Sequence, residues 1–165
     1  MSPRRWIPQR WRVWSAMLAV TSGVLALALS PPLLSPMGRA VVMNVFDPVC
    51  HQLSVRSPVL GGVQVAVCDR CVGIYLGIVL GVASAGWGQW VWKKMRCHVR
   101  YVILGSLVPL GLDWIGPVLG LWTNIPESRA LTGLVFGAVV ASFASDRVLR
   151  AVDRLWTRRA GGADG

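Results

Sequence analysis

The most prominent feature of the sequence is a series of four long apolar segments with charged and turn-forming residues between them. A helix needs about 20 apolar residues to cross the hydrocarbon core of a bilayer, within a range of about 17–25. Three segments fit that length, and the fourth fits once it includes neighbouring residues. The pattern therefore predicts an all-α integral membrane protein with a single domain and four transmembrane helices. The expected spans are residues 13–30, 72–92, 101–122 and 129–147.

The positions of the basic residues predict the orientation of these spans. Most of the 17 lysines and arginines lie in the N-terminal tail, in the loop between the second and third spans, and in the C-terminal tail. The exceptions are Arg39, Arg56, Arg70 and Arg129. Because cytoplasmic segments are enriched in Lys and Arg, we expect a multi-pass protein of the cell membrane with both termini in the cytoplasm. The first loop, residues 31–71, is then extracytoplasmic.

Composition supports a membrane protein and explains the charge. The chain is 54% hydrophobic with a formal net charge of +10, and its mean hydropathy is +0.54. In a soluble protein this charge would suggest a nucleic-acid partner. Here topology and contact with anionic lipid account for it. The bilayer is therefore the expected partner, no nucleic acid is expected, and assembly into a homo-oligomer stays open.

Two of the expected spans carry small residues at every fourth position. Such ridges let helix backbones approach closely, which matters because lipid provides no hydrophobic driving force between helices. We expect both ridges to face other helices, and they could face each other. The glycines of the ridges are Gly73, Gly77 and Gly81 in the second span and Gly133 and Gly137 in the fourth.

Candidate chemistry is concentrated in the first loop and at the start of the second span. Cys50, His51, Cys68 and Cys71 would make a Cys₃His set, a common arrangement for zinc, and copper is possible with softer ligation. The adjacency of Cys50 and His51 makes it difficult for both to reach one ion. Other polar residues are expected at the same membrane level and could support the site. They are Gln52, Arg56, Ser57, Arg70, Tyr75, Asp113, Asn124 and Arg129.

Asp113 lies within the third span, where a carboxylate is costly to bury. It should therefore face the interior of the helix bundle and have a partner. The candidate partners are Arg56, Arg70 and Arg129.

Two other interpretations of the cysteines remain open. Cys68 and Cys71 beside Arg70 could form a reactive thiol–disulfide pair, although the expected outer loop between the last two spans holds no second cysteine pair. A disulfide from Cys50 to Cys68 or Cys71 could instead brace the loop, with the arginines binding anionic lipid or phosphate. No nucleotide-binding glycine loop, HExxH motif or nucleophile elbow is present, so an enzymatic activity is not established. A metal-binding site is the first hypothesis.

The order Cys-His-Gln, Arg-Ser and Cys-x-Arg-Cys-x-Gly-Ile-Tyr-x-Gly resembles a family of small predicted membrane proteins of unknown function in bacteria and archaea. Further residues of that pattern are Asp113, Asn124, Arg129, Thr132, Gly133 and Gly137. Pro58 departs from the pattern, which has an aromatic residue after Arg-Ser. The resemblance implies a membrane protein with its site at these residues, and it implies no activity.

Overall fold

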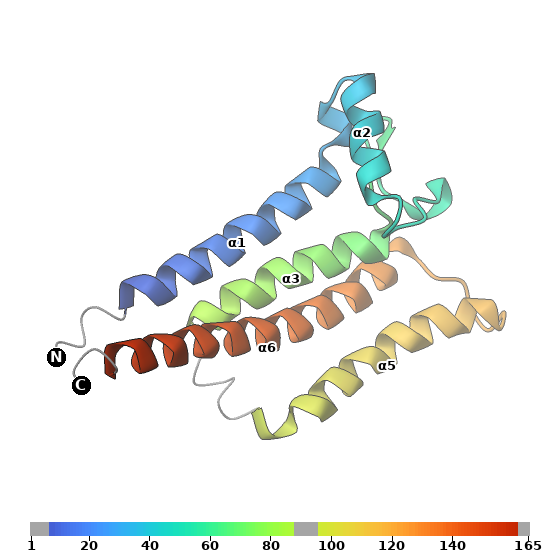
Figure 1. Ribbon diagram of the computed structural model, residues 1–165. Helices are drawn as coiled ribbons and strands as arrows, with labels where there is room; N and C mark the ends of the chain where they lie inside the picture. Colours follow the sequence, from blue (N-terminus) through green and yellow to red (C-terminus); the bar gives the residue numbers. More distant parts are fainter. Residues whose placement is uncertain (1–6, 88–95, 162–165) are drawn as a thin grey trace.

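The computed structural model describes residues 7–87 and 96–161, and this part of the chain is mostly helical. Four of its helices are long and apolar enough to cross a membrane, which confirms the predicted fold class. They are α1 (Ile7–Leu29), α3 (Asp69–Trp87), α5 (Val99–Val118) and α6 (Pro126–Gly161). Helices α1, α3 and α6 run side by side, and α5 lies on the other side of α6 (Figure 1).

The boundaries of the helices differ from the expected spans at several places. Helix α1 begins at Ile7, before the expected residue 13. Helix α3 begins at Asp69, and residues 88–92 of the expected second span lie outside the described residues. Helix α5 ends before Gly120, whose φ of +69° is the left-handed conformation that commonly ends a helix. Helix α6 continues to Gly161, because the residues that follow the apolar part are helix formers and Arg150 pairs with Asp146 one turn earlier at 2.7 Å.

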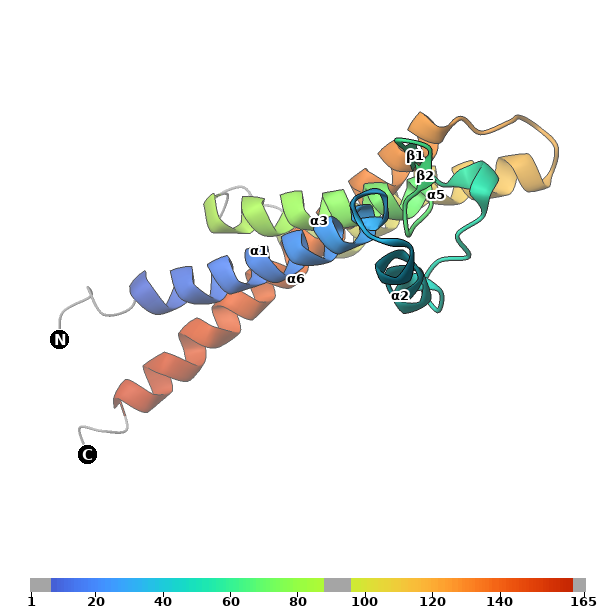
Figure 2. The same cartoon turned by 90° about the horizontal axis from the view of Figure 1, so that it is seen from above.

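The first loop folds over one end of the helices. It contains η2 (Pro31–Leu33), α2 (Pro36–Phe46), η3 (Ser54–Arg56) and a hairpin of two short strands, β1 (Val59–Leu60) and β2 (Val63–Gln64). This hairpin was not predicted. Its turn consists of Gly61 and Gly62, both with positive φ, which is the conformation that a tight hairpin requires. Figure 2 shows α2 and the hairpin together at the end where α3 begins.

A small apolar core attaches the first loop to the helices. Ala28 at the end of α1, Phe46 in α2, and Ala66 and Val67 in the bend before α3 are buried together. The amide of Ala66 also donates to the carbonyl oxygen of Ala28 at 3.0 Å. This core therefore holds Cys50, a further member of the cluster, near the first turn of α3.

Helices α3 and α6 approach each other backbone to backbone. A Cβ atom at Gly77 would lie 2.3 Å from the carbonyl oxygen of Leu134, and one at Gly133 would lie 2.3 Å from that of Arg70. Gly73, Gly81 and Gly137 are equally close to the opposite helix. The small residues of the two helices therefore face each other, and a larger side chain would force the helices apart.

We expect Gly77→Ala to destabilise the protein by about 1–3 kcal/mol, the usual cost of inserting a methyl group into a packed contact. The matched control is Gly105→Ala in α5, where an added Cβ has nothing within 4 Å. Unfolding midpoints in mild detergent measure the difference. Equal midpoints for the two variants would contradict close packing of α3 on α6.

Candidate metal centre

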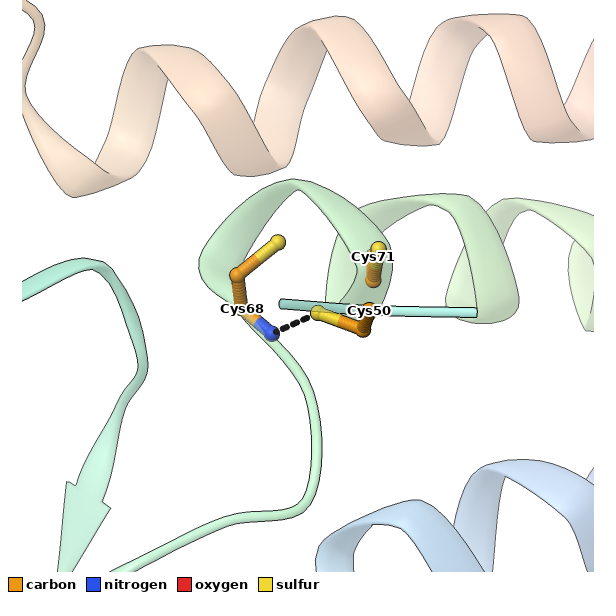
Figure 3. Close-up of side chains that lie close together, drawn as sticks. All are labelled: Cys50, Cys68 and Cys71. Carbon is orange, nitrogen blue, oxygen red and sulfur yellow. Dashed lines mark hydrogen bonds between the residues drawn. The ribbon is translucent and has the colours of Figure 1, made fainter. Parts of the chain in front are cut away.

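Three thiols meet at the start of α3. Cys50 follows α2, Cys68 directly precedes α3, and Cys71 lies in its first turn. The three Sγ atoms all lie within 4.8 Å of one another, and Figure 3 shows the side chains gathered at the end of the helix. Zinc–sulfur bonds of about 2.3 Å in tetrahedral geometry place two sulfurs about 3.8 Å apart. We call these three atoms the sulfur cluster. A small movement that brings the sulfurs closer together would let all three ligate one ion.

The backbone around Cys50 is held by side-chain amides. Gln52 has a φ of +47°, which is uncommon for a residue with a side chain, and its Nε2 donates to the carbonyl oxygen of Met43 at 2.6 Å. Gln64 in turn donates to the carbonyl oxygen of Gln52 at 2.7 Å. The amide of Cys68 donates to Cys50 Sγ at 3.2 Å. These bonds hold the turn that presents Cys50 to Cys68.

A buried carboxylate joins three helices next to the sulfur cluster. Asp113 of α5 is 7% exposed and forms an ion pair through Oδ2 with Arg70 of α3. Its Oδ1 accepts a hydrogen bond from Ser128 of α6 at 3.0 Å, and its main-chain oxygen accepts one from Asn124. Asp113 therefore has the arginine partner expected of an intramembrane carboxylate, and the partner is Arg70.

A second ion pair links α3 to α6. Arg129 Nη1 lies 3.4 Å from Asp69 Oδ2, and Arg129 Nη2 donates to the carbonyl oxygen of Asn124 at 2.9 Å. Asp69 and Arg70 are adjacent in the first turn of α3, so this turn makes charged contacts to both α6 and α5. Charged contacts of this kind tie the ends of the helices to one another.

A cavity of about 430 Å³ opens beside the sulfur cluster. We call it the arginine cavity because Arg56, Arg70 and Arg129 all line it. The three cysteines also line it, and Trp114 and Val118 of α5 contribute apolar surface. The three thiols and the three guanidiniums therefore share one space.

The family whose sequence pattern matches this chain is described as "Predicted membrane protein (DUF2085)", and the match covers residues 50–143. The chain belongs to this family. The matched region extends over more than half of the chain, and it contains the sulfur cluster, Asp113 and all three arginines of the cavity. The residues that match DUF2085 therefore include the candidate site, and the family description names no activity for it.

One relative of this DUF2085 protein is an uncharacterized protein, MJ1492, of the archaeon Methanocaldococcus jannaschii. The two are 28% identical over 99 residues, which are 60% of this chain and 63% of the relative. The alignment thus spans less than two thirds of the relative's length. No solved structure matches the chain.

The structure places the other predicted site residues in different roles. His51 lines the cavity and is exposed, but it does not belong to the group of ligand atoms formed by the three sulfurs. The ring of Tyr75 packs edge-on against Phe46 at 6.0 Å between centroids. Ser57 donates to the carbonyl oxygen of Leu53 at 3.0 Å, which closes η3. Tyr75 and Ser57 therefore shape the surroundings of the cysteines.

Sequence reasoning missed three residues of the site. Asp69 is the acidic partner of Arg129, Ser128 bonds to Asp113, and Trp114 lines the cavity. The available signals were the position of Asp69 between two cysteines and the position of Ser128 at the start of a helix, where short polar side chains are common.

The environment of Cys68 favours its thiolate. A hydrogen bond from the thiol of Cys71 is the largest influence and lowers the pKa of Cys68 from 9.0 to about 5, although burial acts in the opposite direction. Backbone hydrogen bonds from Cys71 and Arg70 add to the lowering. A thiolate is the form that ligates metals and attacks electrophiles. Cys68 should therefore be reactive at a pH where an ordinary thiol is protonated.

We expect Cys68 in reduced, metal-free protein to react with iodoacetamide at a rate that rises near pH 5 and levels off above pH 6. The rate should rise at this low pH because the lowered pKa keeps Cys68 as the reactive thiolate above about pH 5. Trypsin cleavage after Arg56 and Arg70 isolates Cys68 on the peptide 57–70, which mass spectrometry can quantify. Cys71→Ala removes the donor and should move the rise to higher pH. A rise near pH 8.5 in the unsubstituted protein would contradict the interpretation.

Proposed function

We propose that this DUF2085 protein binds one soft metal ion, zinc in the first instance, through Cys50, Cys68 and Cys71. The observation that supports it is the convergence of three Sγ atoms within 4.8 Å from two segments separated along the chain. Thiolates select zinc, copper(I) or iron–sulfur clusters over hard cations. Three sulfurs around one point suit a single zinc ion, with copper(I) as the alternative.

The proposed ion has three protein ligands and one position facing the arginine cavity. Structural zinc sites usually close with four protein ligands, whereas sites that act on other molecules keep one position for water or substrate. His51 is the sequence-predicted fourth ligand, but it is exposed and outside the sulfur group. We therefore assign ligation to the three thiolates and place His51 at the wall of the cavity.

The proposed site lies at the extracytoplasmic face. The first residues of α1 and the last residues of α6 lie at one end of the molecule, and the first loop lies at the other (Figure 1). Arg10 and Asp153, 3.1 Å apart, connect α1 to α6 at the first of these ends. Basic residues are concentrated there, as the positive-inside rule requires of a cytoplasmic face. Both termini are therefore assigned to the cytoplasm and the sulfur cluster to the outside.

A thiol–disulfide function is the second candidate, favoured by the low pKa of Cys68. Oxidation of Cys68 and Cys71 to a disulfide would release two protons and two electrons, and the acceptor would be a membrane quinone or the disulfide of a partner protein. The four cysteines are all within the described residues and none is in a disulfide. Metal binding by Cys68 and Cys71 would block this chemistry, because both thiolates would be occupied.

We expect purified protein to contain about one zinc or copper ion per chain by elemental mass spectrometry, since three converging thiolates bind such ions tightly. Cys50→Ser, Cys68→Ser and Cys71→Ser should each reduce the metal content severalfold. Cys97→Ser is the matched control, because Cys97 is an exposed thiol near His98 outside the sulfur cluster, and it should retain the metal. His51→Ala should also retain it.

Two results would count against the metal site. Protein that stays metal-free after reduction and incubation with zinc or copper(I) would contradict ligation. A Cys68–Cys71 disulfide that is reduced and reformed with quinone, in the absence of metal, would support the thiol–disulfide function instead.

A further inference from the structure

One of the three guanidiniums that line the arginine cavity has no carboxylate partner among the described residues. Three guanidiniums, those of Arg56, Arg70 and Arg129, line it together with one carboxylate, that of Asp113. Arg129 pairs with Asp69, and Arg70 pairs with Asp113. Arg56 is exposed and forms no ion pair or side-chain hydrogen bond with a described residue. A ligand of this cavity would therefore meet one guanidinium, that of Arg56, that no described carboxylate pairs with.

The hydrogen-bonding groups show the same imbalance. The acceptors of Asp113 are occupied, because Oδ1 accepts from Ser128 and Oδ2 from Arg70. Each guanidinium has five N–H donors. Arg70 Nε has no partner among the described residues, and the guanidinium of Arg56 donates to none of them either. The cavity therefore has unpaired N–H donors, while both carboxylate oxygens of Asp113 are already hydrogen-bonded. These donors favour a ligand with negatively charged oxygen acceptors.

One wall of the same cavity is apolar and opens toward the surface of α5. Trp114 is 60% exposed and Val118 is 69% exposed, and both line the cavity. They lie in the last two turns of a candidate membrane span, and the end of such a span is where the hydrocarbon core is expected to meet water. A molecule with a charged head and an apolar chain could place its head among the arginines and its chain along α5.

We propose that the arginine cavity binds the phosphate group of an anionic amphiphile. Arginine is suited to this task because its planar fork of donors matches two phosphate oxygens at once. In this arrangement the unpaired guanidinium of Arg56 binds the phosphate. The guanidiniums of Arg70 and Arg129, which are fixed by their ion pairs with aspartates, line the same cavity. The phosphate belongs either to a lipid or to a soluble anion that uses only the polar part of the cavity. This proposal goes beyond metal binding and does not require a bound ion.

The test compares two lipids with the same chains by native mass spectrometry of protein in uncharged detergent. Dioctanoyl phosphatidic acid carries a phosphate, and dioctanoylglycerol lacks it. We expect the phosphatidic acid to bind at least tenfold more tightly. Arg56→Gln should weaken its binding by about tenfold, the effect of losing one charge-assisted contact. The matched control, Arg39→Gln, removes a charge from the same loop, where Arg39 Nε donates to the carbonyl oxygen of Pro31 at 3.4 Å and Arg39 does not line the cavity.

The outcomes distinguish the proposal from its rivals. Equal binding of the two lipids, or equal loss in the Arg56 and Arg39 variants, would overturn it, because the cavity would then select apolar chains or respond only to net charge. Binding of inorganic phosphate, measured by phosphorus NMR, shows whether the phosphate group comes from a lipid or from a soluble anion. Binding of inorganic phosphate that weakens in Arg56→Gln supports a soluble anion, and binding confined to phosphatidic acid supports a lipid. Metal content, measured on the same samples, reports separately on the proposed ion.

Discussion

The close approach of α3 and α6 determines where every part of the site lies. Because glycine has no side chain, Gly73 and Gly133 allow the first turns of the two helices to touch through their backbones. This contact places Asp69 opposite Arg129 and Cys68 and Cys71 at the loop end of the pair. Without a hydrophobic driving force in lipid, such packing and a few polar contacts must hold the helices together. The sulfur cluster and the arginine cavity therefore both depend on the glycines that line the contact between α3 and α6.

Charged pairs at the ends of the helices add a second constraint. Asp113 lies on α5, and its bonds to Arg70 and Ser128 fix that helix against α3 and α6. A buried ion pair is costly to break because the remaining partner stays uncompensated. The pair thus keeps Trp114 and Val118 beside the cysteines, which gives one cavity both a polar and an apolar wall.

Local sequence patterns were sufficient for the number of candidate membrane helices, since hydrophobic length and small-residue spacing are properties of neighbouring residues. They also identified Asp113 as a carboxylate in need of an arginine. They could not choose Arg70 over Arg56 or Arg129, because that choice depends on how α5 lies against α3. The position of His51 depends on the left-handed turn at Gln52, which no pattern indicated. The long C-terminal part of α6 was missed because the expected span was bounded by its apolar residues. The residues that follow are polar but still favour a helix.

The proposed centre brings together sulfur ligands and arginines at one membrane surface, so the coordination of the ion tests the account most directly. X-ray absorption spectroscopy of the zinc-loaded protein measures which atoms surround the metal. The account predicts three sulfur neighbours at about 2.3 Å and one lighter atom. A shell made only of nitrogen and oxygen, or a shell unchanged in Cys68→Ser, would contradict it.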